Sequence, residues 1–289
     1  MSREVIRSGR AAIELRHGDS LVELASLEPG SIDVVVTSPP YNLGIDYASF
    51  DDGRSRDEYL AWTARWMALV KRALAPRGSF FLNIAGKPRD PWGPFEVAGV
   101  GRQSFALQNT IYWVKSIAVA VDGEDLSVGH YKPINSKRFL NDCVEFVFHF
   151  THEGAVELDR LAIGVEYADK SNVTRWKAAG ADRHCRGNAW FVPYSTIQSR
   201  DKDRPHPASY PPELAARAIR LHGLERVRRV LDPFSGIGST ALACAELGVD
   251  HLGVELDPGY HAEAVRRLRA RAVERATSRS LFERPAPSP

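Results

Sequence analysis

A glycine turn near the C-terminal end of the chain combines acidic residues with a backbone that a ligand can approach closely. The run from Asp232 to Gly238, Asp-Pro-Phe-Ser-Gly-Ile-Gly, separates an apolar, strand-like segment from a helix-like segment, and Glu255 ends the next apolar segment. An acid placed about 20 residues beyond such a turn accepts hydrogen bonds from ribose hydroxyls in nucleotide-binding folds. The pattern therefore predicts a cofactor that carries a ribose.

Two classes of cofactor fit this turn. It satisfies the dinucleotide fingerprint formally, so a nicotinamide or flavin enzyme is one interpretation. Asp232, however, would face the negative charge of a pyrophosphate, whereas it suits the positively charged amino group of S-adenosylmethionine. Charge therefore favours S-adenosylmethionine, while a turn that merely connects two elements remains the alternative without a ligand.

The run Thr37-Ser38-Pro39-Pro40-Tyr41 is a second unusual group of residues. Consecutive prolines fix the direction of backbone carbonyls, and a neighbouring tyrosine offers a flat face to a planar base. The exocyclic amine of a base is a poor nucleophile because its lone pair is delocalised into the ring. We expect Ser38 and the Pro39 carbonyl to accept hydrogen bonds from its N–H groups. A rigid strand end with a half-exposed tyrosine is the alternative without chemistry.

With these motifs in this order, the sequence resembles the beta class of DNA amino-methyltransferases, whose catalytic motif is [DNS]PP[YFW]. The resemblance extends over roughly residues 12–268, with TSPPY before HPASYP and DPFSGIGST. It implies an α/β, Rossmann-like S-adenosylmethionine-dependent methyltransferase fold with a mostly parallel sheet, circularly permuted. It also implies direct methyl transfer to a base flipped out of double-stranded DNA. The catalytic residues would be Ser38, Pro39, Pro40 and Tyr41.

The resemblance also implies which residues contact the cofactor. Asp19 matches the acid that contacts the cofactor's adenine, and HPASYP matches a cofactor-contacting stretch. The predicted contacts are Asp19, Thr37, His206, Pro207, Ala208, Asp232, Pro233, Phe234, Gly236, Gly238, Ser239, Thr240 and Glu255. Within the family, SPPY is associated more often with N4 of cytosine and DPPY with N6 of adenine. Cytosine is therefore the expected target and adenine the alternative; an RNA base methyltransferase and a non-catalytic nucleic-acid-binding module also remain open.

Basic residues before and after the predicted strand at 144–150 are candidates for gripping DNA. Lys132, Lys137 and Arg138 lie among aromatic residues and are predicted to contact phosphates. Residues 153–196 lack core periodicity and are rich in side chains that read base edges, so we assign target recognition to them. His184 and Cys185 have no second pair of ligands nearby, so no metal site is expected.

Alternating strand-like and helix-like segments must position these motifs, as in an α/β sheet. Strands are predicted at 12–15, 32–37, 79–84, 110–114, 144–150, 227–231 and 251–255. Helices are predicted at 21–27, capped by Ser20, and at 57–75, 212–223, 240–247 and 258 to about 275. Residues 1–152 and 197–275 would form the catalytic domain, 153–196 the target-recognition region, and 276–289 a flexible tail.

Composition narrows the function little. A chain of 289 residues with 44% hydrophobic residues can bury a large core, and its formal net charge of +2 neither requires nor excludes a nucleic acid partner. The sequence contains neither an apolar run of ~20 residues nor a secretory signal, so we expect a cytoplasmic protein without a membrane partner. The resemblance adds a homodimer and an accompanying restriction endonuclease as expected partners.

Overall fold

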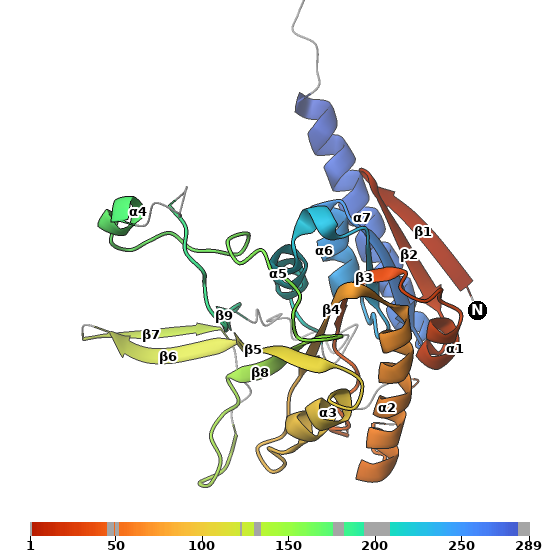
Figure 1. The fold of residues 1–289 in the computed structure, drawn as a ribbon, viewed down its shortest axis with the longest axis horizontal. Helices are drawn as coiled ribbons and strands as arrows, with labels where there is room; N and C mark the ends of the chain where they lie inside the picture. The colour runs from red at the N-terminus through yellow and green to blue at the C-terminus, as the bar shows by residue number, and fades with distance from the viewer. Residues whose placement is uncertain are drawn as a thin grey trace, which may run out of the picture.

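One nine-stranded sheet organises the computed structural model (Figure 1), which describes residues 2–44, 49, 52–121, 123–129, 134–175, 182–193 and 209–282. In spatial order its strands are β1 (Ser2–Ser8), β2 (Ala11–His17), β11 (Asp250–Glu255), β10 (Arg229–Asp232), β3 (Ile32–Thr37), β4 (Leu74–Ile84), β8 (Val144–Thr151), β5 (Ala106–Val114) and β9 (Ala189–Phe191). A separate hairpin pairs β6 (Ser116–Val121) with β7 (Glu124–Gly129).

The five neighbouring strands from β2 to β4 run parallel, while β1 and β8 pair antiparallel with the two ends of this block. Carboxyl ends of parallel strands meet at one edge of a sheet, and ligands bind there in open α/β sheets. The Ser38 motif (Ser38–Tyr41) follows β3, and the glycine turn (Asp232–Gly238) begins at the end of β10. Because β3 and β10 are paired, the two motifs are neighbours at this edge. The predicted α/β fold with a mostly parallel sheet is confirmed.

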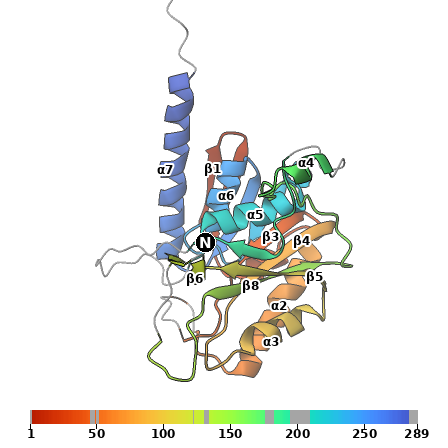
Figure 2. The ribbon, with the colours of Figure 1, turned by 90° about the vertical axis from the view of Figure 1, so that its left-hand side faces the viewer.

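Helices cover both faces of the sheet (Figures 1 and 2). On one face lie α5 (Pro212–His222), α6 (Ser239–Leu247) and α7 (Pro258–Phe282), and on the other α1 (Ser20–Ala25), α2 (Arg56–Ala73) and α3 (Gly93–Gly101). A short helix, α4 (Ser171–Arg175), and a 3-10 turn (Leu224–Arg226) complete the helical elements of the described residues. Each helical layer packs its apolar side chains on the sheet, which gives one core on either face.

The helix α2 shows how the sequence sets these elements. Ser55 and Glu58 form a capping box at its start, and the helix buries Trp62 and Trp66 at helical spacing. Lys71 and Arg72 lie in its last turn, where cations oppose the negative end of the helix dipole. The predicted helix at 57–75 is therefore confirmed to within two residues at its end.

Several predicted details differ from the structure. Asp19, not Ser20, caps α1, because its carboxylate accepts a hydrogen bond from Leu21 N at 2.6 Å. The helix α7 continues to Phe282, beyond the predicted end near residue 275, because 276–282 contains neither proline nor glycine to stop it. The strand β1 and the helix α3 were not predicted. Three of the seven residues of β1 are charged, which hides its strand pattern, and three glycines and a proline weaken the helix pattern of α3.

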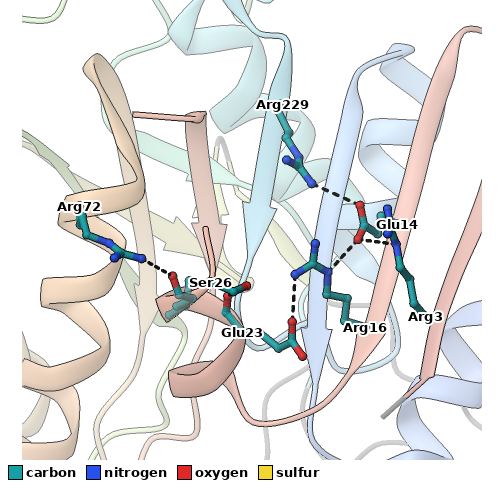
Figure 3. Close-up of polar contacts among 8 residues, drawn as sticks. Arg3, Glu14, Arg16, Glu23, Ser26, Arg72 and Arg229 are labelled. Carbon is teal, nitrogen blue, oxygen red and sulfur yellow. Dashed lines mark hydrogen bonds and ion pairs between the residues drawn. The ribbon is translucent and has the colours of Figure 1, made fainter. Parts of the chain in front are cut away.

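A charged network holds the β1 side of the sheet together (Figure 3). The carboxylate of Glu14 on β2 is only 7% exposed. Its partners are Arg3 Nε at 2.8 Å, Arg16 Nε at 2.7 Å and Arg229 Nη2 at 3.3 Å, and Arg16 also binds Glu23 of α1 at 2.9 Å. A buried carboxylate is tolerated because it is paired, so this network fixes β1, β2, β10 and α1 relative to one another.

The predicted target-recognition region is partly joined to the sheet. The strand β9 within it pairs parallel with β5, and Trp190 on β9 is fully buried. The indole of Trp113 donates to the carbonyl of Val192 at 2.8 Å. Both α4 and the β6–β7 hairpin extend past this edge (Figure 1). The partition at 153–196 stays a prediction. No helix of the described residues is long and apolar enough to cross a membrane.

Candidate active site at the carboxyl edge of the sheet

The carboxylate of Asp232 joins the two motifs. It ends β10, is 1% exposed, and burial raises its pKa, an effect that hydrogen bonds to the ionised form oppose. The donors are Thr37 Oγ1 at 2.7 Å, Thr240 Oγ1 at 2.8 Å, Tyr210 OH at 3.0 Å and Phe234 N at 3.1 Å. Asp232 therefore ties together the end of β3, the start of α6 and the segment before α5.

Tyr210 is a site residue that we did not predict individually, although it lies in the HPASYP stretch. Its hydroxyl also contacts Thr240, and burial together with the nearby Asp232 raises its pKa well above the ordinary value. The hydroxyl thus stays protonated and donates to the carboxylate. Of the same stretch, His206, Pro207 and Ala208 lie outside the described residues.

The glycine turn and Glu255 lie side by side, as the motif requires. Gly236 N donates to Glu255 Oε2 at 2.7 Å, and Asp257 N donates to Glu255 Oε1 at 2.8 Å. Burial raises the pKa of Glu255 to about 7, although these backbone donors favour its ionised form. Gly238 has φ of 81°, and a Cβ there would lie 3.1 Å from Ala264 Cβ. Glycine is therefore needed for both backbone conformation and packing at this position.

The first helix of the chain borders the same turn. Ser20 Oγ donates to the Pro233 carbonyl at 2.5 Å, and Gly18 N donates to the Glu255 carbonyl at 2.8 Å. The side chain of Asp19 between them is exposed at the carboxyl end of β2. The structure thus brings the predicted residues Asp19, Pro233 and Glu255 to one edge. The α6 helix begins at Ser239 beside them, where the backbone N–H groups of its first turn lack helical partners.

Phe234 anchors the turn to the opposite face of the sheet. Its ring lies 5.4 Å from the ring of Trp62 and 5.3 Å from that of Trp66, measured between centroids. Aromatic pairs at these separations add to the free energy of burial. Of the predicted cofactor residues, Phe234 therefore has a clear packing role on α2.

The Ser38 motif forms a cluster of polar side chains beside this turn. Ser38 Oγ and Tyr41 OH are 2.5 Å apart, and Asn83 Nδ2 lies 2.7 Å from Tyr41 OH. Glu145 Oε2 accepts from Asn83 Nδ2 at 2.7 Å and from Tyr41 OH at 3.1 Å. Lys115 Nζ lies 3.1 Å from the other carboxylate oxygen, Glu145 Oε1. The cluster therefore joins β4, β5 and β8 to the loop after β3.

Hydrogen bonds from α2 and to Asp52 hold the loop after β3, which carries the Ser38 motif. Tyr59 OH of α2 donates to the Pro40 carbonyl at 2.9 Å. The buried carboxylate of Asp52 accepts from Asn42 N at 2.7 Å and Leu43 N at 2.9 Å, and Asn42 adopts a positive φ of 56°. Asparagine tolerates this conformation better than most residues. The loop is thus held by hydrogen bonds on both sides of Tyr41.

Sequence analysis missed Asn83, Glu145 and Lys115 as site residues. Asn83 and Glu145 are nevertheless polar residues within the mostly apolar strands 79–84 and 144–150. A buried polar group in such a strand needs a hydrogen-bond partner, and that is the signal that identifies them. Lys115, which directly follows β5, carries no comparable signal.

The predicted phosphate contacts are only partly covered by the structure. Lys137 and Arg138 are exposed, and no carboxylate of the described residues lies within ion-pair distance of either. The guanidinium of Arg138 lies 5.0 Å from the centroid of the Phe139 ring. Lys132 lies outside the described residues. Lys137 and Arg138 are therefore available to a polyanion.

Comparison of the sequence with known protein families identifies the family of this chain. A family model described as DNA methylase, for N6 and N4 methyltransferases, matches residues 32–266, most of the chain. The chain belongs to the N6/N4 DNA methylase family. The prediction from the two motifs and their order is thereby confirmed, and this DNA methylase carries both of them at one sheet edge.

Two curated relatives match this DNA methylase over most of both chains. The type II methyltransferase M.ScaI of Streptomyces caespitosus is 29% identical over 271 residues, which cover 89% of this chain and 82% of the relative. The DNA adenine methyltransferase YhdJ of Escherichia coli K12 is 24% identical over 265 residues, or 92% of this chain and 85% of the relative. The sequence similarity thus extends beyond the motifs to the whole domain.

Solved structures share the fold. PvuII DNA methyltransferase, described as cytosine-N4-specific, has a TM-score of 0.59 at 19% identity and covers 91% of this chain and 92% of its own. The putative DNA modification methylase TTHA0409 of Thermus thermophilus, complexed with S-adenosyl-L-methionine, has a TM-score of 0.56 at 24% identity, with 90% and 93% covered. The predicted Rossmann-like S-adenosylmethionine-dependent methyltransferase fold is therefore confirmed. One relative is named for adenine and one structure for cytosine, so the target base is a separate question.

Proposed function

We propose that this DNA methylase transfers the methyl group of S-adenosylmethionine to N4 of a cytosine flipped out of double-stranded DNA. The observation that carries the proposal is the hydrogen bond from Thr37 to Asp232. Thr37 immediately precedes the Ser38 motif, and Asp232 immediately precedes the glycine turn. A base held by one motif and a cofactor held by the other would therefore be neighbours, as direct transfer requires.

The residues around the glycine turn fit S-adenosylmethionine, which supplies an electrophilic methyl group on a sulfonium centre. Glu255 offers carboxylate oxygens to ribose hydroxyls beside the Gly236 backbone. Asp19 is exposed at the next strand end, where it would contact the adenine. Asp232 is already satisfied by four donors, so its contribution is the shape of the turn and a negative charge beneath it. That charge favours a cationic ligand over a pyrophosphate.

At the other motif, acceptors prepare the amine for attack. Ser38 Oγ and the Pro39 carbonyl would each accept an N–H hydrogen bond, which directs the nitrogen lone pair toward the methyl group. The ring of Tyr41 would stack on the base, with its hydroxyl held at Ser38. The new N–C bond would form as the bond between the methyl carbon and sulfur breaks, the bonding pair would stay on sulfur, and the methylated amine would then release its extra proton to solvent water. Orientation of the two reactants supplies most of the rate.

Cytosine is proposed because position 38 is a serine. In the family that the sequence resembles, a serine at this position of the motif is associated more often with N4 of cytosine, and an aspartate with N6 of adenine. DNA would be held through phosphate contacts of Lys132, Lys137 and Arg138 and read by residues 153–196. A homodimer and an accompanying restriction endonuclease stay predictions from the family resemblance.

The proposal is tested by product identification. Purified protein is incubated with S-adenosylmethionine and mixed unmethylated bacterial DNA, and the digested nucleosides are identified by mass spectrometry. N4-methylcytosine is expected, and Ser38→Ala should abolish it. N6-methyladenine instead would keep the family activity and contradict the choice of base. Methylated RNA with unmodified DNA would contradict the choice of substrate.

A further inference from the structure

A five-residue chain of polar side chains extends away from the Ser38 motif into the sheet. It runs from Ser38 through Tyr41 and Asn83 to Glu145 and ends at Lys115. Asn83 is 3% exposed, and the side chains of Glu145 and Lys115 are 13% and 18% exposed. Burying so many polar groups costs free energy unless they are hydrogen-bonded to one another, and these bonds fix the arrangement of the side chains. The direction of each hydrogen bond shows what is fixed.

An ionised carboxylate only accepts hydrogen bonds, so Glu145 sets the orientation of its neighbours. The NH2 group of Asn83 must face Glu145, because turning the amide would set Asn83 Oδ1 against carboxylate oxygen. Asn83 Nδ2 then also donates to Tyr41 OH. The hydroxyl of Tyr41 has a single proton. Glu145 Oε2, 3.1 Å away, can accept this proton but has none to donate, so Tyr41 donates to Glu145. Tyr41 is thereby an acceptor toward Ser38.

The remaining proton is that of Ser38. Its oxygen lies 2.5 Å from Tyr41 OH, a separation that requires a proton between the two atoms. Since the proton of Tyr41 is directed to Glu145, this proton comes from Ser38. Ser38 Oγ also accepts from Asn83 Nδ2 at 3.4 Å, which leaves one lone pair of Ser38 for a donor from the substrate. Asn83 Oδ1 is buried and meets no donor within the described residues, so Ser38 Oγ is the acceptor of this cluster that a substrate can reach.

We propose that Glu145, held by Lys115, is a positioning residue for methyl transfer: through Asn83 and Tyr41 it turns the Ser38 proton away from the base. Ser38 Oγ is then a ready acceptor for one N–H of the target amine. This inference rests on the proposed function and deepens it. It assigns a role to Asn83 on β4, Glu145 on β8 and Lys115 after β5, none of which the Ser-Pro-Pro-Tyr motif contains.

Two charged groups, Lys115 and Asp142, lie near the Glu145 carboxylate. Lys115 faces it from the end of β5, and the Asp142 carboxylate precedes it on the same segment, close enough for repulsion from Glu145 to contribute to the raised pKa of Asp142. Burial is the larger cause of that raised pKa. Lys115 pairs with Oε1 of Glu145 and leaves Oε2 to accept from Asn83 and Tyr41, which sets the direction of the whole chain of hydrogen bonds.

The test compares Glu145→Gln with Glu28→Gln, the same substitution at an exposed glutamate outside the site. A glutamine can donate to Tyr41, which frees the tyrosine proton for Ser38 and reverses the chain. We expect kcat for DNA methylation about 100-fold lower, comparable to losing one preorganised hydrogen bond. The KM for DNA and the Kd for S-adenosylmethionine should stay within about twofold, and Glu28→Gln should match the wild type.

Lys115→Met gives an independent readout if Glu145→Gln fails to fold. Without the ammonium, Glu145 loses the ion-pair partner that fixes its carboxylate, so kcat should fall while the KM for DNA and the Kd for S-adenosylmethionine stay within about twofold of the wild type. A purely structural role would lower thermal stability and leave kcat of the folded protein unchanged. Wild-type kcat in either Glu145→Gln or Lys115→Met would overturn the role of Glu145 alone. Wild-type protein that methylates no DNA would overturn the proposed function, and this role with it.

Discussion

The two halves of the site differ in how completely their polar groups are satisfied. Around Asp232 both carboxylate oxygens have hydrogen-bond donors, and the residue is 1% exposed. Around Ser38 the side chains are half-buried, and Asn83 Oδ1 has no donor among the described residues. Ser235 Oγ of the glycine turn also has no partner among the described residues, so the difference lies in the central side chains. The Asp232 carboxylate has its donors before a ligand arrives, whereas Ser38 is arranged to receive a donor from a substrate.

This difference separates a framework from a reaction surface. Substitutions in the Asp232 half should affect folding, cofactor binding and transfer together. Substitutions in the Ser38 half should affect transfer and leave folding and cofactor binding nearly intact. Variants that violate this division would break the comparison, and the cases below are ordered from the largest expected effect to the smallest.

Asp232→Ala should have the largest effect. It leaves three buried hydroxyl donors, those of Thr37, Tyr210 and Thr240, without their acceptor. We expect a loss of about 3 kcal/mol in the free energy of unfolding, from the cost of unsatisfied buried groups, with weaker S-adenosylmethionine binding and no detectable transfer. Denaturant unfolding and calorimetric titration measure the two quantities. Unchanged cofactor affinity would show that the turn does not depend on this carboxylate.

Tyr41→Ala should weaken binding and methylation of the base and leave cofactor binding unchanged. It removes the stacking surface and the link between Ser38 and Glu145. Since a stacked base is worth about 1–3 kcal/mol, kcat/KM for DNA should fall about 10- to 100-fold while the Kd for S-adenosylmethionine stays within about twofold. Tyr41→Phe is the matched variant that keeps the ring and loses only the hydroxyl. Equal losses in cofactor binding and transfer would contradict the division of the site.

The raised pKa of Glu255 predicts a pH dependence of cofactor binding. Burial raises this pKa to about 7, so below pH 7 the free protein holds the carboxyl in its neutral form. Ribose hydroxyls donate better to the ionised form, so affinity for S-adenosylmethionine should rise as pH increases from 6 to 8 and then level off. Glu255→Gln should bind more weakly and lose this dependence. A flat profile in the wild type would contradict a ribose contact at Glu255.

The same shift has the opposite sign for stability without cofactor. The folded carboxyl keeps its proton up to about pH 7, whereas in the unfolded chain it ionises near its ordinary pKa of 4.5. Its contribution to the free energy of unfolding is therefore fully present below pH 4.5 and is lost as pH rises through 7. Unfolding of wild type and Glu255→Gln at pH 5 and pH 8 separates this contribution from those of other groups.

The smallest effects are expected at the cations that are predicted to contact DNA phosphates. Lys137→Ala and Arg138→Ala each remove one exposed positive charge. Each should raise the KM for DNA about two- to threefold and reduce the salt dependence of DNA binding by about one phosphate contact. Both should leave kcat at saturating DNA unchanged. Salt titrations of DNA binding provide the measurement, and an unchanged slope in both variants would place the phosphate contacts elsewhere.

The division of the site also explains what could be predicted from the sequence. Both motifs are continuous runs of residues, and the glycine turn with Glu255 follows the spacing of one βαβ unit, so local pattern was enough to find them. The contacts of Glu145 with Asn83 and Tyr41 join residues 62 and 104 positions apart. Only the antiparallel pairing of β8 with β4 and β5 brings them together, and no local spacing reports that pairing.

Two further details depended on tertiary contacts. Asp19 and Ser20 are both good capping residues, and the choice between them follows from the hydrogen bond of Ser20 to Pro233 across the turn. Phe234 was expected to touch the cofactor because it lies in the motif, yet the pair of tryptophans on α2 accounts for its packing. The parallel block, by contrast, follows from strands and helices that alternate along the chain.

The most direct test of the account measures cofactor binding and methyl transfer side by side in Ser38→Ala. Calorimetric titration gives the Kd for S-adenosylmethionine, and single-turnover assays with unmethylated DNA give the transfer rate. The account predicts a Kd within about twofold of the wild type and a transfer rate lower by at least about 100-fold, since Ser38 is a preorganised partner of the reacting amine. A variant that still transfers at the wild-type rate, or that loses cofactor binding in step with transfer, would contradict it.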